Sequence, residues 1–382
     1  MTAATYQEIV DENGRTYRIG ESARDIMGRS RSWMVWLPWV AMMAVSVFEY
    51  GWGAVVGTLE DKYHWTLGDV FWLASIWAVF QAGVAFPAGR LRERNVVSAK
   101  TAMLAGAVLS GIGYFTIAHS GSLLVAFIGY SVLGGTGAGL VYAPCINMVG
   151  KWYPEKRGAR TGFVNGGFAY GSVPFIYIFS AYLTHQNTTI VLDLIGLYML
   201  IAVAVCGFLF KDPPKNWWPA TVDPITWARG KSGVKSLAKN PPAVRQFTPM
   251  EAIRTGMLPL MWVCLVIIGG VSLFMVFAFL SGFGGGAFYP LFAALVPDYF
   301  GENNNASNYG LVYSAKLVGG VGGGGLAAGV VSVWGYTGAY ILAGSIALLS
   351  AVLTLFLRQP GRARPLSVQP DVVAQPTAAT GG

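Results

Sequence analysis

The chain has 382 residues, of which 54% are hydrophobic and only 12% are charged, and its mean hydropathy is +0.50. Since about a quarter of the residues of an average soluble domain are charged, this composition excludes an ordinary soluble globular protein and indicates an integral membrane protein. The formal net charge of +8 is compatible with a nucleic-acid partner until the distribution of the charge is considered.

A first group of apolar runs follows a charged N-terminal segment. Residues 1–31 contain many charges and no apolar core, so we expect no cleavable signal peptide. A bilayer core of about 30 Å needs about 20 helical residues. We therefore predict six transmembrane helices, near residues 33–59, 70–87, 102–118, 123–148, 161–182 and 190–210.

A second group of apolar runs lies beyond a polar segment at residues 211–258. The runs cover residues 259–297, 309–331 and 337–357, and a tail rich in Pro, Ala and Thr follows, which we expect to be disordered. One helix over residues 259–297 would be about 58 Å long. Since this is too long for one span, we predict two helices that meet near residues 272–277, and about ten spans in all.

The basic residues follow a pattern along the chain. Every Lys and Arg except Lys62 and Lys316 lies in the two tails, in the segments at 90–100 and 151–160, or in the central polar segment. The positive-inside rule then predicts that both termini and the central loop are cytoplasmic, as for a multi-pass protein of the plasma (inner) membrane. The positive charge is thereby explained by topology, and a nucleic-acid partner is not expected.

A weak repeat connects the two halves. Gly135, Gly137, Gly139 and Tyr142 in the first half have counterparts in the second half, namely Gly282, Gly284, Gly286 and Tyr289. Such repeats are typical of secondary transporters. Gly135/Gly139, Gly162/Gly166 and Gly167/Gly171 are also small-residue pairs at the spacing that lets helices pack closely.

Three motifs resemble those of a known family. They are Gly89-Arg90-Leu91-Arg92-Glu93-Arg94 after the second run, Lys151-Trp152-Tyr153-Pro154-Glu155-Lys156-Arg157-Gly158 after the fourth, and Asp212-Pro213-Pro214-Lys215-Asn216-Trp217-Trp218-Pro219 after the sixth. Over about residues 30–357 the chain resembles the major facilitator superfamily, and within it the oxalate/formate antiporter-like family. It departs from the first motif at Glu93, where Asp is usual, and at Val96, where Gly is usual.

The resemblance implies an all-α, polytopic membrane fold of two helical bundles that transports small carboxylates, oxalate or formate among them, by alternating access. The family norm is twelve helices, whereas the second half here is too short for six. We therefore expect a cytoplasmic tail (1–31), a six-helix bundle (32–210), a cytoplasmic central loop (211–258), a shortened bundle (259–357) and a disordered cytoplasmic tail (358–382).

Lys316 is the main candidate for substrate binding. A charge inside a span is costly and indicates function, and Tyr313 lies one turn before it on the same helical face. The resemblance implies that a lysine at this position binds the substrate carboxylate. The alternatives are a structural pair with Glu49 or a cation near the cytoplasmic mouth. Glu49, in the first span, would be this ion-pair partner, a carrier of a coupling proton or a hydrated carboxylate.

Further substrate-binding candidates are polar or aromatic residues of the spans, for which packing is the alternative: Tyr50, Trp52, Tyr142, Tyr289 and Gln81. The resemblance implies that an arginine of the eighth helix assists the lysine. That helix is among those that are missing, and no Arg lies within a predicted span. A transport-impaired family member is therefore an alternative function, as is transport of another organic anion.

Other classes of function find no support. No G-x-x-x-x-G-K-[ST] motif is present, so ATP is not expected as a partner. His64, His119 and His185 lie in the predicted outer connections without a ligand cluster, so no metal site is predicted, and no cofactor. No acid, base and nucleophile occur together in the spans, which argues against an enzyme. The substrate, the exchange or proton-symport mode, the direction and the oligomeric state remain open.

Overall fold

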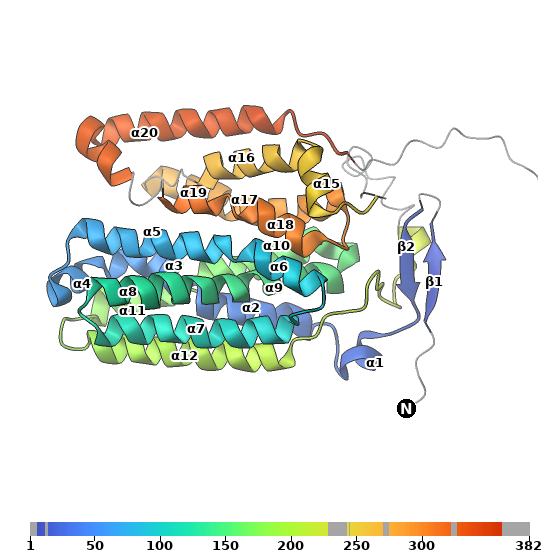
Figure 1. Cartoon of the computed structure of the whole chain (residues 1–382), viewed down its shortest axis with the longest axis horizontal. Coiled ribbons are helices and arrows are strands. Elements are labelled where there is room, and N and C mark those ends of the chain that lie inside the picture. The colour runs from blue at the N-terminus through green and yellow to red at the C-terminus, as the bar shows by residue number, and fades with distance from the viewer. Residues whose placement is uncertain are drawn as a thin grey trace, which may run out of the picture.

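The computed structural model describes residues 6–11, 14–227, 243, 245–269, 275–321 and 327–360. Nearly all of the elements in this part of the chain are helices, and they form two layers (Figure 1). Helices α2 to α12 form one layer and α15 to α20 form the other, while a small hairpin, β1–β2, lies at one end of the molecule.

The first layer consists of broken and continuous helices in chain order. They are α2 (Trp33–Val45), α3 (Val47–Gly51), the 3₁₀ turn η1 (Trp52–Ala54), α4 (Val56–Tyr63), α5 (Leu67–Gly83), α6 (Ala85–Glu93), α7 (Ala99–His119), α8 (Leu123–Ala126), the π-helical η2 (Phe127–Gly134), α9 (Gly135–Trp152), the 3₁₀ turn η3 (Pro154–Lys156), α10 (Arg157–Tyr170), α11 (Val173–Tyr182) and α12 (Thr188–Leu209).

The second layer begins after the central segment. Its helices are α15 (Pro249–Arg254), α16 (Met257–Gly269), α17 (Met275–Phe300), α18 (Asn305–Tyr313), α19 (Lys316–Val321) and α20 (Ala327–Thr354), and α20 is bent at Gly335, where φ is +65°. The predicted pair of helices within residues 259–297 is confirmed by α16 and α17. Residues 272–274 of the predicted junction lie outside the described residues.

Several predicted spans are interrupted and are not single continuous helices. The run at 33–59 contains a bend of 40° after Val45, and the run at 161–182 breaks between α10 and α11. The two breaks lie side by side: the Ser172 hydroxyl donates to the Ser46 carbonyl at 2.8 Å, and a Cβ on Gly171 would lie 2.4 Å from the Met43 carbonyl oxygen. A side chain of one break is thus hydrogen-bonded to the backbone of the other, and a polar group within a bilayer needs such a partner.

The prediction of one helix over residues 309–331 is wrong. The helix begins earlier, at Asn305, breaks after Tyr313, and resumes as α19; residues 322–326 lie outside the described residues. The early start is possible because buried polar groups have hydrogen-bond partners. The backbone N–H of Ser307 donates to the Glu93 carboxylate at 2.8 Å, and the side-chain amide of Asn308 donates to the Phe247 carbonyl at 3.1 Å. Hydropathy alone does not detect such paired polar residues.

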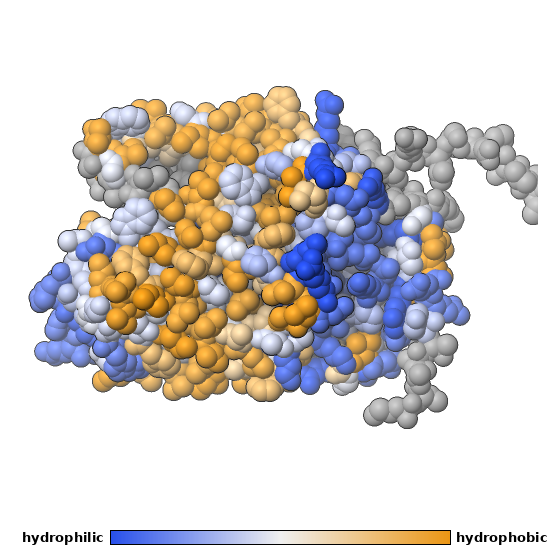
Figure 2. Space-filling model, viewed as in Figure 1, coloured by the Kyte–Doolittle hydropathy of each residue, from blue (hydrophilic) through white to orange (hydrophobic). Residues whose placement is uncertain are grey.

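The surface supports an assignment to the membrane. On the face that Figure 2 shows, apolar residues cover the middle of the molecule, and hydrophilic residues collect toward both ends. Within the described residues, five helices are long and apolar enough to cross a bilayer, or six if the bent segment Trp33–Val45 with Val47–Ala54 is counted as one. This arrangement is that of a polytopic membrane protein.

Glycines set the distances between helices of the first layer. A Cβ on Gly135 or Gly139 would lie 2.4 or 2.2 Å from a backbone oxygen of α5, so α9 packs directly on the α5 backbone. Gly167 and Gly171 allow α10 to approach α2 in the same way. The predicted role of Gly162 is wrong, because a Cβ there would meet nothing within 4 Å.

The N-terminal segment is folded. Strands β1 (Gln7–Val10) and β2 (Thr16–Ile19) form an antiparallel hairpin, which α1 (Ala23–Met27) follows. Arg18 of β2 accepts an amide hydrogen bond from Trp218 at 2.9 Å and donates one to Asn216 at 2.8 Å. Tyr17 packs edge-on against Trp218 at 5.0 Å, and its burial raises the pKa of its hydroxyl to about 12. The hairpin is therefore docked on the start of the central segment.

This end of the molecule, where the hairpin, the central segment and the α6–α7 and α9–α10 connections meet, is called the basic end below. Ion pairs join the two layers there: Arg157 of α10 binds Asp298 of α17 at 3.0 Å and also binds Glu302. The α6 helix packs on α18, since a Cβ on Gly89 would lie 2.5 Å from the Ala306 carbonyl oxygen. The layers are thus in close contact at the basic end.

Candidate functional site

Lys316 lies where the helix that carries it is interrupted. Helix α18 ends at Tyr313, Ser314 and Ala315 form a turn, and Lys316 is the first residue of α19. The lysine is only 9% exposed, and its ammonium extends from the second layer to α3 and α5 of the first. An interrupted helix at the interface of two helical layers is a common location for the binding site of a transporter.

Two side chains of the first layer bind the ammonium. Lys316 Nζ forms an ion pair with Glu49 Oε1 of α3, and it donates to Gln81 Oε1 of α5 at 2.5 Å. Glu49 is itself next to a break, because α3 is a five-residue helix between the bend at Ser46 and the turn η1. The cation and its counter-ion therefore both lie on short, interrupted helical segments.

Two polar atoms of this group have no partner among the described residues. Glu49 Oε2 and Gln81 Nε2 are buried and make no hydrogen bond. The amide of Gln81 must direct its oxygen toward Lys316, because an ammonium group is only a donor, and this leaves the NH₂ group unused. Since a buried polar group without a partner is costly, the site has one vacant acceptor and one vacant donor.

Aromatic rings surround the ammonium. Nζ of Lys316 lies 5.7 Å from the ring centre of Tyr313, 5.8 Å from that of Tyr289 and 5.8 Å from that of Phe168. These rings come from α18, α17 and α10, so both layers contribute. Cation–π attraction helps to hold a charge that has been removed from water.

A stack of tyrosines extends from this cage between the layers. Tyr142 of α9 stacks on Tyr313 with ring centres 4.4 Å apart. The Tyr142 hydroxyl donates to Asn165 Oδ1 at 2.9 Å and lies 3.3 Å from the Tyr309 hydroxyl, which donates to it because Tyr142 has already used its one hydrogen. The counterparts Tyr142 and Tyr289 of the sequence repeat therefore contact the same residue, Tyr313, from opposite sides of the interface.

The structure brings together most of the predicted site residues, but not all of them. Lys316, Glu49, Gln81, Tyr313, Tyr289 and Tyr142 form one connected group. Tyr50 is half exposed and contacts Phe168. Trp52 lies elsewhere: its ring stacks on Tyr130 at 4.9 Å and its indole nitrogen donates to the Val70 carbonyl at 3.1 Å, so it packs within the first layer.

Sequence reasoning missed three members of the group, namely Phe168, Asn165 and Tyr309. Asn165 and Phe168 lie three residues apart on α10, and Tyr309 lies one turn before Tyr313 on α18. A polar residue in an apolar run could have indicated Asn165. The two aromatic residues gave no signal that distinguished them from ordinary packing residues.

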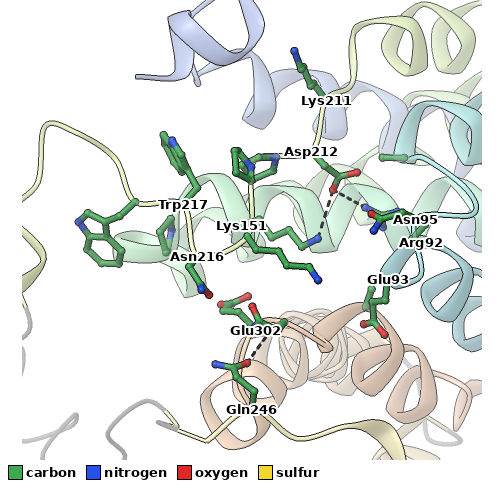
Figure 3. A pocket seen from close by; sticks show the side chains of 18 of the residues that line it. Arg92, Glu93, Asn95, Lys151, Lys211, Asp212, Asn216, Trp217, Gln246 and Glu302 are labelled. Carbon is green, nitrogen blue, oxygen red and sulfur yellow. Dashed lines mark hydrogen bonds and ion pairs between the residues drawn. The ribbon is translucent and has the colours of Figure 1, made fainter. Parts of the chain in front are cut away.

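A cavity of about 650 Å³ lies at the basic end (Figure 3). Its walls include the hairpin, the central segment, the α6–α7 connection and the start of α18. Arg92 at 2.9 Å and Lys151 at 3.6 Å converge on Asp212, and these two cations hold the pKa of its carboxyl below the ordinary value although burial alone would raise it. Lys316 is not among the residues that line this cavity.

The arrangement at Lys316 suits a carboxylate. A buried ammonium, a free amide donor and aromatic walls can bind a small anion, and no reactive nucleophile takes part in the group. Among the described residues there is no group of three His, Cys, Asp or Glu side chains that could hold a metal ion.

The model of the Major Facilitator Superfamily matches residues 38–256 and 252–378. The chain is 23% identical over 375 residues to the oxalate:formate antiporter of Oxalobacter formigenes, an alignment that covers 83% of this chain and 88% of that protein. It is 22% identical over 193 residues to human monocarboxylate transporter 14, with 47% of this chain and 36% of that one covered. Both are therefore distant relatives.

A solved structure with a similar fold is that of the proton:xylose symporter XylE. The TM-score is 0.57 at 13% identity, and 86% of this chain and 96% of that one are covered. At this identity the likeness concerns the fold alone. The predicted fold class agrees with it.

Proposed function

Because this chain belongs to the Major Facilitator Superfamily, and is therefore a multi-pass membrane transporter and not an enzyme, we propose that it transports small carboxylates by alternating access, with Lys316 as the residue that binds the substrate. The names of two relatives, an oxalate:formate antiporter and a monocarboxylate transporter, support this class of substrate.

One observation carries the proposal: the buried ammonium of Lys316 lies between the two layers, within an aromatic cage to which both layers contribute. A buried charge is retained at a cost of several kcal/mol, and in a membrane helix it is a functional group by default. An anion bound there would contact both layers, so its binding and release can be coupled to their relative movement.

Alternating access would begin from a state that is closed at the basic end. The ion pairs of Arg157 with Asp298 and Glu302 connect α10 to α17, and Glu93 binds Ser307 of α18. These contacts would have to break before the substrate could leave toward that end. The proposed roles are therefore binding for Lys316 and gating for Arg157.

We also propose that the protein lies in the plasma (inner) membrane with both termini and the basic end in the cytoplasm, because the basic residues gather there. Reporters fused to the C-terminus test this orientation. Activity of a cytoplasmic reporter is expected, whereas activity confined to an external reporter would contradict it.

The transport proposal is tested by uptake into proteoliposomes that contain the purified full chain. Labelled formate, pyruvate and oxalate serve as probes, in counterflow against the same unlabelled anion, with protein-free liposomes as the control. Saturable counterflow of at least one carboxylate is expected. No counterflow with any carboxylate, although the protein is monodisperse and folded, would refute the proposal.

A transport-impaired protein is the second candidate. The low burial of α20 favours it. In the most apolar 18 residues of α20 only 6% are buried, whereas the figure for α7 is 56%. A helix with so little cover fits a second bundle that lacks some of its packing partners. In that case the counterflow experiment would fail with every anion.

A further inference from the structure

Glu49 occupies the position that the proposed function gives to the substrate. Its carboxylate binds the same ammonium that a transported carboxylate would bind, and Gln81 also accepts a hydrogen bond from that ammonium. The side chains of Glu49 and Lys316 are only 10% and 9% exposed, so solvent does not screen the pair. A substrate anion can therefore bind Lys316 only if the charge of Glu49 is removed from the site.

We propose that Glu49 is the proton-binding residue of this transporter, and that it takes up one proton for each monocarboxylate that replaces it at Lys316. This inference rests on the proposed function and decides its mode, because it makes the protein an electroneutral proton symporter of monocarboxylates.

The charge balance of the site supports this stoichiometry. Without substrate, one ammonium and one carboxylate cancel. A monocarboxylate would add one negative charge to a desolvated site in which Lys316 is the one basic residue; the sequence from Met257 to Thr354 contains no other Lys or Arg. A proton on Glu49 restores neutrality: Lys316 then pairs with the substrate, and the Glu49 carboxyl group is uncharged.

The two unpaired polar atoms of the site suit the two steps of the proposal, which are uptake of a proton and binding of the substrate anion. Glu49 Oε2 has no hydrogen-bond partner among the described residues, so a lone pair is free to accept the proton. The NH₂ group of Gln81 likewise has no partner and lies next to the ammonium, where it can donate to a substrate oxygen. Glu49 thus has an oxygen that can bind the proton, and Gln81 has an NH₂ group that can bind the substrate that replaces Glu49 at Lys316.

The groups that face Glu49 are four tyrosines and one lysine. The titratable groups that face it are Lys316 of α19, Tyr313 of α18, Tyr289 of α17, Tyr130 of η2 and Tyr50 of its own helix. Helices α2 and α11, which pack on α3, contain no charged residue, and the two tyrosines of α11 are mostly exposed. Among the described residues, Lys316 is therefore the single cation that faces Glu49.

The proton is bound and released as follows. From the side with more acid, one H⁺ adds to Glu49 Oε2 and the R–COO⁻ of the substrate binds Lys316. On the other side the anion leaves, Glu49 loses the same proton, and the Lys316–Glu49 pair forms again. One proton and one monoanion cross together, so no net charge moves.

The test compares two assays of the full chain in proteoliposomes with labelled pyruvate, which is almost fully ionised near neutral pH and therefore crosses lipid slowly without a carrier. In the first assay a pH gradient drives net uptake while valinomycin and K⁺ set the membrane potential. In the second, counterflow is measured at equal pH. The wild type should accumulate pyruvate by up to about tenfold per pH unit, without response to the membrane potential.

Glu49→Gln should lose the response of net uptake to the pH gradient, because a glutamine side chain cannot take up the proton, and the counterflow that remains should no longer depend on pH. Glu49→Asp, which can still titrate, should retain part of the gradient response. A Glu49→Gln protein with the full gradient response, or wild-type uptake that follows the membrane potential, would overturn this inference and leave the proposed function intact. Absence of counterflow by the wild type would overturn both.

A second measurement uses the wild type alone, so it does not depend on the folding of a variant. Pyruvate added to weakly buffered, detergent-solubilised protein at neutral pH should remove about one proton from solution per anion bound, as a pH indicator reports. Sodium chloride added at the same concentration is the control. Saturable binding without proton uptake would overturn the inference.

Discussion

The ion pair at Lys316 and the ion pairs at the basic end join the same two layers, but in opposite environments. Lys316 and Glu49 are both about 90% buried and pair one to one. At the basic end the cation Arg157 is buried, whereas Asp298 and Glu302 are 30% and 21% exposed and share it. A buried pair loses a great deal when one partner is removed, while solvent screens the partly exposed pairs. The first group is thus suited to exchange its anion and the second to hold a conformation.

The comparison is tested most strongly by Lys316→Ala. The change leaves Glu49 buried without a counter-ion and removes the anion-binding group, a loss of about 3–5 kcal/mol. We expect carboxylate counterflow to fall by at least about 100-fold. Lys62→Ala is the matched control, because Lys62 lies at the opposite end, where it donates to the Thr189 hydroxyl at 2.6 Å and lies over the ring of Tyr63.

The double variant Lys316→Ala with Glu49→Gln removes both charges and should fold with a melting temperature near that of the wild type. It shows whether lost transport reflects lost binding or lost structure. Lys316→Arg should retain little activity, since a planar guanidinium binds anions with another geometry. Counterflow that is unchanged in Lys316→Ala would remove Lys316 from the site.

The next largest effect is the preference of the Lys316 site for monoanions over dianions. The buried site has one cation, so the second carboxylate of oxalate would be desolvated without a partner. We expect formate or pyruvate to be preferred over oxalate by about 100-fold in half-saturation concentration, which corresponds to about 3 kcal/mol. Competition of unlabelled oxalate against labelled pyruvate measures this directly.

Equal competition by oxalate in a monodisperse, heat-resistant monomer would show that a second cation is not needed. It would also remove the case for a transport-impaired, shortened second bundle. Lower thermal stability in detergent than that of a twelve-helix relative is the result that this case predicts.

A smaller effect is expected for Arg157→Gln. The change breaks the bonds to Asp298 and Glu302 and should favour opening of the basic end, with a loss of transport of about tenfold. Accessibility of a cysteine introduced at Asn303 reports the opening. Arg160→Gln is the control, because Arg160 lies over the ring of Tyr153 in its own layer. Equal accessibility in both variants would show that Arg157 does not hold the gate.

The smallest expected effect concerns pH at the basic end. Arg92 and Lys151 lower the pKa of Asp212 below its ordinary value of 3.8 in spite of burial. Its contribution to stability is therefore complete above about pH 4 and decreases as the pH falls through the lowered pKa. Because the side chain is 35% exposed, we expect at most about 1 kcal/mol. Melting temperatures of the wild type and of Asp212→Asn from pH 3 to 7 should converge at the acid end.

The fold and the candidate site were predictable to different degrees. Long apolar runs determined α5, α7, α9 and α12, because each must cover the bilayer core with one continuous stretch. The breaks at Ser46, Gly171 and Ser314 were not predictable, since each depends on a partner from another helix. Hydropathy contains no information about such partners.

At the site, charge was the decisive signal. Lys316 and Glu49 were found because charged residues are rare in apolar runs, and Gln81 because it is polar in one. Trp52 and Phe168 are both aromatic residues in spans, and only their neighbours in the fold show that the first packs within its layer and the second belongs to the cage. Three-dimensional contacts between the layers decide between the two roles.

The docking of the N-terminal hairpin has a consequence for the order of biosynthesis. Residues 16–18 leave the ribosome first, but their partners Asn216 and Trp218 are made only after all of α2 to α12. The hairpin therefore has no place to dock until the first layer has been inserted. Once it docks, it joins the beginning of the nascent chain to the end of that layer while the second layer is still being synthesised. The docked hairpin thus marks the completion of the first layer during translation.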